Sequence, residues 1–146
     1  IIAPEIRPEA LAIFAQKKNL RVLSWSALSK FKTNTSLRSV DGGYLVQEED
    51  QIATDTSQWQ FLGEKPSASL QKDLSFAWKT CAMLKSNAIS VCGQSQSLGL
   101  GMGQVNRVDS VRQALDRAKE FHPQAKDLIL ASDAFFPFAD SVEIAA

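Results

Sequence analysis

The sequence has few of the residues that build metal centres, disulfide scaffolds and catalytic triads. It contains two cysteines and one histidine in 146 residues. Cys81 and Cys92 are too few for a disulfide framework and lack the CxxC spacing of a zinc site, so we expect both thiols to be reduced and to lie in the core. His122 precedes Pro123 and predicts an interaction with a helix C-terminus. A single histidine excludes a histidine-ligated zinc and a Ser-His-Asp triad, and we predict no metal site.

The sequence also lacks an excess of charge and a long apolar run. Lysine plus arginine and aspartate plus glutamate each number 16, so no net charge attracts a nucleic-acid backbone or an anionic membrane. No apolar stretch approaches the roughly 20 residues that cross a bilayer. The first turns carry Pro4, Glu5 and Arg7, where a signal peptide is apolar. We expect a cytoplasmic protein with no nucleic-acid or membrane partner.

The composition is that of an ordinary folded domain. Hydrophobic residues make up 45% of the chain and charged residues 22%, which suits one core. The chain begins with Ile1 rather than methionine and stops at Ala146 within an apolar pattern. We therefore expect residues 1–146 to form one partial domain, incomplete at both ends.

Apolar periodicity predicts alternating helices and strands. The expected elements are helices over 5–18, 71–85 and 108–118, buried strands over 20–25 and 128–131, a turn at 42–43 leading into a strand over 44–46, a hairpin of 88–92 and 97–101, and a final helix from Asp140. Residues 26–38 predict a polar surface connection, and 48–69 show little periodicity. This order of elements is typical of a layered α/β domain.

Three short segments have both a structural and a functional interpretation. Residues 85–87 lie at a helix-to-strand junction, where polar side chains cap the helix or point into a cleft. Glycines alternate over 99–103, and bare backbone there permits close approach of either another backbone or a ligand. Their spacing is not that of a dinucleotide-binding GxGxxG motif. Gln104, Asn106 and Arg107 then begin a helix, where free amides and a guanidinium can together hold an anion, although a lone arginine is more often a surface charge.

Three aromatic rings follow the last predicted strand. Phe135, Phe136 and Phe138 surround Pro137, and loops at strand ends carry such clusters when they line a pocket or an interface. Core packing is the alternative for at least one of the rings. We predict that Phe135 or Phe138 points into a cleft shared with Asn87.

Several of these segments resemble, in the same order, motifs of the AICAR formyltransferase domain of bacterial-type bifunctional purine-biosynthesis proteins, where AICAR is aminoimidazole carboxamide ribonucleotide. The resemblance runs nearly from end to end and is weakest over 26–37 and 48–70. The matching blocks are IIAP at 1–4, KKNLRVL at 17–23, GGYLVQ at 42–47, KSNAI at 85–89, GLGMGQVNRV at 99–108 and SDAFFPFAD at 132–140.

The resemblance implies a folate-dependent enzyme of purine nucleotide biosynthesis. Such a domain transfers a formyl group from 10-formyltetrahydrofolate to the exocyclic amine of AICAR, on a layered α/β fold similar to cytidine deaminase but without its zinc. In the family a separate domain carries the IMP cyclohydrolase activity. The implied partners are AICAR and folate, together with a second copy in a homodimer or a companion chain.

The resemblance also assigns roles to individual residues. The Asn of the SNAI motif contacts the substrate near the reacting centre, which makes Asn87 the candidate catalytic residue. The Arg of the GQxxR motif corresponds to Arg107, a candidate substrate-binding residue. Phe135, Phe138 and Asp140 correspond to folate-site residues. Gly42 is a further candidate near the nucleotide.

The departures from the family bear on activity. The family's catalytic Lys-His pair precedes the first matching block, and its PGGSxRD and RHFRH-like segments follow the last, so the sequence contains none of the three. We therefore expect the chain alone to show no formyl transfer, and whether it acts as an enzyme is open. The alternative is a non-catalytic remnant that serves as a structural or interaction subunit. A nucleotide deaminase is disfavoured by the missing Cys and His ligands.

Overall fold

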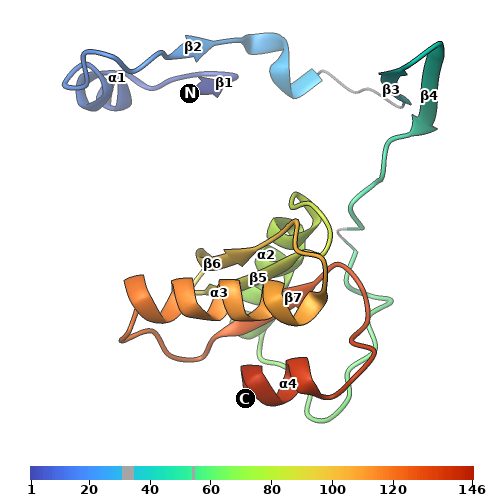
Figure 1. Cartoon of the computed structure of the whole chain (residues 1–146). Helices are drawn as coiled ribbons and strands as arrows, with labels where there is room; N and C mark the ends of the chain where they lie inside the picture. The colour runs from blue at the N-terminus through green and yellow to red at the C-terminus, as the bar shows by residue number, and fades with distance from the viewer. Residues whose placement is uncertain (31–34, 54) are drawn as a thin grey trace. The chain divides into compact units, whose positions relative to one another are not determined.

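The computed structural model describes residues 1–30, 35–53 and 55–146. The chain divides into two compact units, Ile1–Gln51 and Ile52–Ala146 (Figure 1). In the part of the chain that the structure describes, no helix has the length and apolar character needed to span a bilayer.

The first unit is built from short elements. They are β1 (Ile2–Ala3), α1 (Pro8–Phe14), β2 (Leu23–Ser24), the 3-10 helix η1 (Ser26–Lys30), β3 (Thr35–Val40) and β4 (Gly43–Glu48). β1 and β2 pair in parallel, and β3 and β4 form an antiparallel hairpin. Gly42 has a φ of +78°, which explains why glycine occupies the turn between β3 and β4 and confirms the turn predicted at 42–43.

Three predictions for this unit are wrong in extent. The helix expected over 5–18 covers only Pro8–Phe14, and the buried strand expected over 20–25 is reduced to two exposed residues, Leu23–Ser24. The polar connection expected over 26–38 contains η1 and the start of β3, while its residues 31–34 lie outside the described residues. None of the described residues 1–30 and 35–51 is buried. An apolar run becomes a buried strand only when another surface covers it, and the described residues of this unit provide none.

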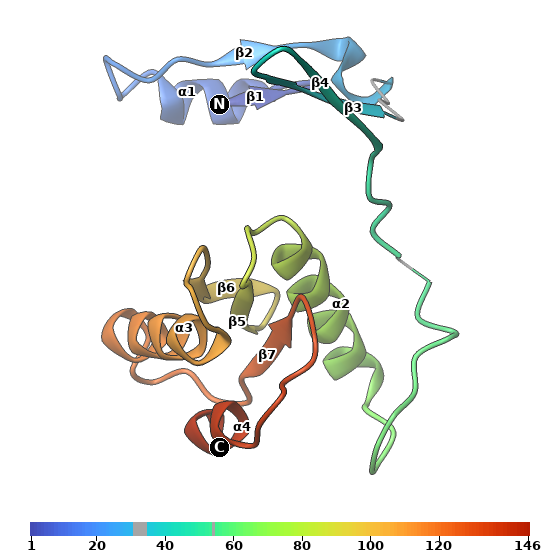
Figure 2. The same ribbon diagram turned by 45° about the vertical axis from the view of Figure 1, so that its right-hand side comes forward.

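In the described residues of the second unit, a three-stranded sheet packs with three helices (Figure 2). Its elements are α2 (Ala68–Ala82), β5 (Ile89–Gly93), β6 (Gln96–Gly101), α3 (Arg107–Phe121), β7 (Ile129–Ser132) and α4 (Asp140–Ala145). The strand order is β6-β5-β7, and the central strand β5 is antiparallel to both neighbours. The hairpin, the later helices and the helix beginning at Asp140 are thus confirmed, with α2 starting three residues earlier than expected because Ser67 caps it.

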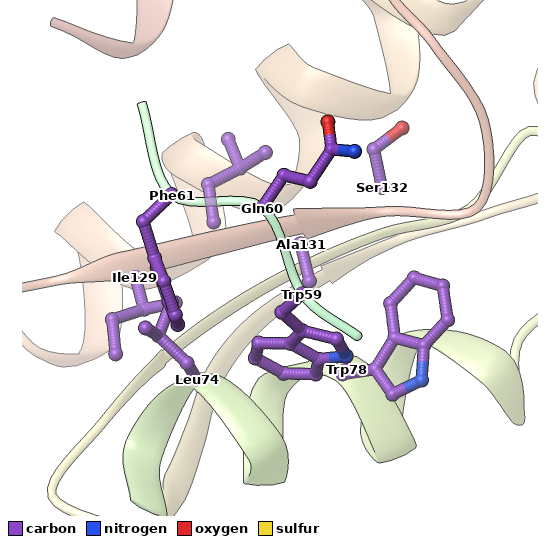
Figure 3. Close-up of a pocket in the computed structure, with 9 residues that line it drawn as sticks. Trp59, Gln60, Phe61, Leu74, Trp78, Ile129, Ala131 and Ser132 are labelled. Carbon is purple, nitrogen blue, oxygen red and sulfur yellow. The ribbon is translucent and has the colours of Figure 1, made fainter. Parts of the chain in front are cut away.

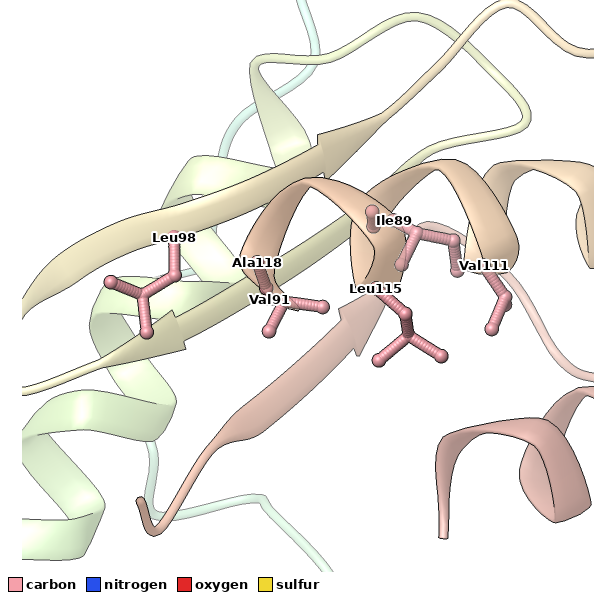
Figure 4. Close-up of a cluster of buried hydrophobic side chains, with 7 residues drawn as sticks. Ile89, Val91, Leu98, Val111, Leu115 and Ala118 are labelled. Atoms are coloured by element: carbon pink, nitrogen blue, oxygen red, sulfur yellow. The ribbon is translucent and has the colours of Figure 1, made fainter. Parts of the chain in front are cut away.

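Alternation along β5 gives the second unit its layers. Ile89 and Val91 pack with Val111 and Leu115 of α3, forming the larger core cluster (Figure 4). Cys92, on the opposite face, packs with Ala77 of α2 in a second cluster. The sheet is therefore covered by α2 on one face and by α3 on the other, which is the layered α/β arrangement that the sequence predicts. Cys81 and Cys92 are buried free thiols, as expected.

Two of the alternating glycines are explained by packing between β6 and α3. A Cβ on Gly99 would lie 1.9 Å from the carbonyl oxygen of Ala114, and a Cβ on Gly101 would lie 1.9 Å from that of Ser110. Only glycine permits the helix backbone to approach the strand this closely. The structure thus favours the packing interpretation of Gly99 and Gly101. Gly103 has open space at the Cβ position and a φ of +69°, so its requirement is conformational.

Candidate functional site

The candidate site lies where the end of β7 meets the start of β5 in the second unit. The register pairs Ile89 with Ser132, so the residues just before β5 and just after β7 are neighbours. Asn87 precedes β5, Asp133 follows β7, and Arg107 begins α3. Segments that are distant in the sequence therefore bring an amide, a carboxylate and a guanidinium to one place.

Arg107 links the three segments. Its Nη1 donates to the Ser132 hydroxyl at 2.9 Å and forms an ion pair with Asp133 Oδ1. Its Nη2 donates to Asn87 Oδ1 at 3.1 Å. The Arg107 side chain is 11% exposed and that of Asp133 is 20% exposed. Arg107 is therefore not the free surface charge of the alternative interpretation, because its guanidinium is held inside a polar network.

The Asn87 side chain is held from both ends of its amide. Oδ1 accepts from Arg107, while Nδ2 donates to the backbone carbonyl of Gln104 at 3.0 Å and lies 3.4 Å from that of Val105. The fully buried Ser110 hydroxyl donates to the Asn87 backbone carbonyl at 2.7 Å, and the Ser86–Asn87 peptide bond is cis. The contacts of Oδ1 with Arg107 and of Nδ2 with Gln104 give the side-chain amide one defined orientation.

The side chains of Gln104, Asn106 and Arg107, expected to help hold an anion, are hydrogen-bonded within the protein, and an anion site on the backbone amides there stays a prediction. Asn106 is the N-cap of α3, where its Oδ1 accepts from the Asp109 backbone amide at 2.8 Å. Its Nδ2 donates to the Asp109 carboxylate at 2.8 Å. Gln104 Nε2 donates to the Met102 carbonyl at 3.3 Å. The polar groups satisfy one another, and an anion would have to displace a carboxylate.

Asp133 is ionised more readily than an ordinary aspartate. Burial acts to raise its pKa, but hydrogen bonds from Ser86, Arg107 and Ala88 and the charge of Arg107 together outweigh burial and lower the pKa. Both carboxylate oxygens have a partner, since Ser86 Oγ donates to Oδ2 and Arg107 donates to Oδ1. The ion pair is therefore formed throughout the neutral range.

A cavity of about 350 Å³ adjoins this network and contains three of the expected ligand residues. Its lining residues are Asn106, Arg107, Val108, Asp109, Arg112, Pro137, Phe138, Asp140 and Ser141. Phe138 is 72% exposed, so its ring is available to a ligand. Asn87 does not line this cavity, so the predicted cleft shared with Asn87 is not found among the described cavities; Phe138 and Asn87 are linked only through Arg107, which lines the cavity and donates to Asn87 Oδ1.

The three aromatic rings separate into different environments. Phe136 packs against the larger core cluster, so core packing holds for this ring alone. Phe135 is 80% exposed and lines none of the described cavities. Gly42 belongs to the first unit, and its expected place near a nucleotide stays a prediction. Core packing therefore accounts for Phe136, while Phe135 and Phe138 are exposed.

A second cavity, of about 470 Å³, was not expected from the sequence. It is lined by Trp59, Gln60, Phe61, Leu74, Trp78, Ile129, Leu130, Ala131 and Ser132 (Figure 3). Trp59 and Trp78 meet edge to face, with ring centroids 6.4 Å apart, and Trp78 donates to the Ala53 carbonyl at 3.2 Å. Trp59, Gln60 and Phe61, from the stretch in which the sequence shows little periodicity, meet β7 and α2 at this cavity.

The sequence assigned no individual role in the site to Ser86, Ser132 or Asp133. A usable signal was present, because polar residues stand immediately before one buried strand and immediately after another. Adjacent antiparallel strands place such positions side by side. The sequence alone does not show that β5 and β7 are neighbours in the sheet. These polar residues could therefore not be placed together before the strand order was known.

Comparison with known proteins identifies the family. The model of the AICARFT/IMPCHase bienzyme family matches residues 1–117. Over 147 aligned residues, the chain is 49% identical to the bifunctional purine biosynthesis protein PurH of Nostoc punctiforme and 46% identical to that of Enterococcus faecalis. Each alignment covers 100% of this chain and 28% of the relative. The chain belongs to the AICARFT/IMPCHase bienzyme family and spans little more than a quarter of the length of these relatives.

Proposed function

We propose that this chain forms part of a formyltransferase site in which a formyl group passes from 10-formyltetrahydrofolate to the amine of AICAR. The observation that carries the proposal is the gathering of Asn87, Arg107, Phe138 and Asp140 around one network and one cavity in a single unit. We further propose that the intact domain has the deaminase-like layered fold, of which the sheet described here is a part.

In the proposed reaction, the amine nitrogen attacks the formyl carbon. A tetrahedral intermediate forms, the bond from the formyl carbon to folate N10 breaks, and a proton leaves the amine while N10 gains one. An aromatic amine is a weak nucleophile, so orientation and removal of the amine proton matter for the rate. Asn87 Oδ1 accepts one hydrogen bond from Arg107, and a carbonyl oxygen has two lone pairs. The second lone pair suits an N–H of the reacting amine.

The cavity beside Arg107 suits a flat ring with polar edges. Phe138 offers an exposed ring face for stacking, and Pro137 stiffens the loop that carries it. Asp140, whose Oδ1 accepts from the Ser141 backbone amide at 2.7 Å, retains acceptor capacity for ligand nitrogens. We assign this cavity to the folate, with Phe135 as a second aromatic contact and Gly42 near the nucleotide.

The proposal requires residues that this sequence does not contain. It has no counterpart of the family's Lys-His pair, and His122 is the C-cap of α3 rather than a member of the network. The first unit has no buried residue among those described and exposes Leu37, Tyr44, Leu45 and Val46 on its hairpin. We therefore propose that a second copy or a companion chain covers this exposed apolar surface.

A chimera tests the folate assignment. The segment of Nostoc punctiforme PurH that aligns with this chain is replaced by this chain, and binding of tetrahydrofolate and of AICAR is titrated separately. Phe138→Ala should weaken tetrahydrofolate binding by about tenfold while leaving AICAR binding nearly unchanged, because a stacking face is lost. Phe136→Ala is the matched control, because its ring packs on the core and its loss should lower stability without changing affinity in the folded protein.

The assignment is wrong if the Phe138→Ala chimera binds tetrahydrofolate as tightly as the unsubstituted chimera. It is also wrong if Phe138→Ala and Phe136→Ala change the affinity for tetrahydrofolate equally, since equal effects would mean that Phe138 only supports the structure of the loop.

A further inference from the structure

We propose that Asp133 is a positioning residue that sets the orientation of the Asn87 amide by holding Arg107. This inference rests on the proposed function for its catalytic consequence, but its structural part can be measured without any activity. Asp133 was not among the residues that the sequence or the family resemblance assigns to the site.

The first step of the argument is that Arg107 distinguishes the two ends of the Asn87 amide. Its guanidinium has only donors, so the atom facing it must be the acceptor Oδ1, at 3.1 Å. The backbone carbonyl of Gln104 has only acceptors, so the atom facing it must be the donor Nδ2, at 3.0 Å. A flipped amide would bring donor against donor and acceptor against acceptor. Arg107 therefore fixes which atom Asn87 presents at each end.

The second step is that Asp133 fixes Arg107. The carboxylate pairs with Nη1 from one side, and the Ser132 hydroxyl accepts from the same nitrogen at 2.9 Å. Nη2 is thereby directed at Asn87. A guanidinium whose side chain is only 11% exposed needs a counter-charge to stay there. Without the carboxylate, the charged group gains by moving toward water, and the contact with Asn87 is lost.

The third step is that Asp133 is itself held in place. Ser86 Oγ donates to Oδ2, the oxygen that Arg107 does not use. Ser86 contacts Asp133, Asp133 contacts Arg107, and Arg107 contacts Asn87. Because Ser86 and Asn87 are adjacent in sequence, these contacts form a closed ring that begins and ends in the loop before β5. In the proposed reaction this closed arrangement keeps the free lone pair of Asn87 Oδ1 in one direction, which favours an amine N–H over a hydrogen-bond acceptor.

The structural test uses the chain as it is, labelled with ¹⁵N. Asp133→Asn keeps the shape of the side chain and removes its charge, so it should shift the Asn87 side-chain amide resonances and speed their exchange with solvent. Ser86→Ala should shift them in the same direction by less. Glu120→Gln is the matched control, because it removes one carboxylate from an exposed ion pair with Arg117 on α3 and should leave the resonances unchanged. Unchanged Asn87 resonances in both folded test variants would overturn the proposal.

The catalytic test is a double-mutant cycle in the chimera. If Asp133 acts through Arg107, Asp133→Asn should lower kcat by about tenfold to a hundredfold with little change in KM for folate. Combining it with Arg107→Ala should add almost nothing to the loss caused by Arg107→Ala alone. Multiplying effects would show that Asp133 acts independently and would overturn the proposal. If the resonances respond while even the unsubstituted chimera transfers no formyl group, the proposed function fails and the positioning of Asn87 stands.

Discussion

Replacing Gly99 with alanine should separate α3 from the sheet. The added Cβ would lie 1.9 Å from the Ala114 carbonyl oxygen, and 2.9 Å from both the Ala114 carbonyl carbon and the Ala118 nitrogen. These are atoms of the helix backbone, so no side chain can rotate away. Restoring an ordinary contact requires a displacement of about 1.5 Å, which opens the core around Val111 and Leu115. Overpacking of this kind costs about 3 kcal/mol or more.

Urea unfolding followed by circular dichroism at 222 nm measures the loss. Gly93→Ala is the control in the same sheet, because its Cβ would find Leu128 and Leu98 side chains at 3.5 Å, an ordinary contact. The control should change the free energy of unfolding by about 0.5 kcal/mol or less. A Gly99→Ala loss below about 1 kcal/mol, or a loss equal to that of the control, would refute the packing explanation of the glycines.

Three further predictions concern titration and association. Burial raises the pKa of Cys81 to about 11, so about one thiol in a thousand is ionised at pH 8 and a thiol reagent should modify native Cys81 far more slowly than the unfolded chain. In the folded chain the pKa of Asp133 lies below its ordinary 3.8. The ionised carboxylate therefore stabilises the fold above pH 3.8, and this stabilisation is lost as the pH falls through the lower, folded pKa. In urea titrations the difference in unfolding free energy between the unsubstituted chain and Asp133→Asn should shrink between about pH 7 and pH 3. The exposed apolar hairpin should make the chain associate, and Tyr44→Lys with Val46→Lys should lower the mass measured by light scattering, whereas equal masses would count against this.

The elements of the second unit could be predicted because turn residues and apolar periodicity within short segments mark their positions. The hairpin of β5 and β6 joins neighbouring segments through Gln94 and Ser95, which both have positive φ, and alternation along β5 marks its two faces. The start of α2 was misplaced although Ser67 is a good N-cap residue, so the capping signal was present and unused.

The same reasoning fails where burial depends on a partner surface. The apolar run over 20–25 has the composition of a buried strand, yet β2 is short and exposed. An amphipathic pattern states which face prefers burial and not what will cover it. The preference is satisfied only by a neighbouring element, and the first unit offers none among its described residues.

The site was predicted residue by residue but not as a network. The resemblance indicated Asn87 and Arg107, and the aromatic loop indicated Phe138 and Asp140. Asp133 was given no role because that role depends on the pairing of β5 with β7, a contact between distant segments that no local pattern fixes. The glycines illustrate the same limit, since their alternation and the following helix were both predicted, but the packing of that helix against the glycines was not.

The measurement that tests the central claim most directly is single-turnover formyl transfer to AICAR by the chimera, with and without Asn87→Ala. The unsubstituted chimera should transfer the formyl group, and Asn87→Ala should lower the rate constant at saturating substrates by about a hundredfold with the fold retained. Glu120→Gln should leave the rate unchanged. A folded Asn87→Ala chimera that transfers at the unsubstituted rate, or an unsubstituted chimera that binds both substrates and transfers nothing, would contradict the account.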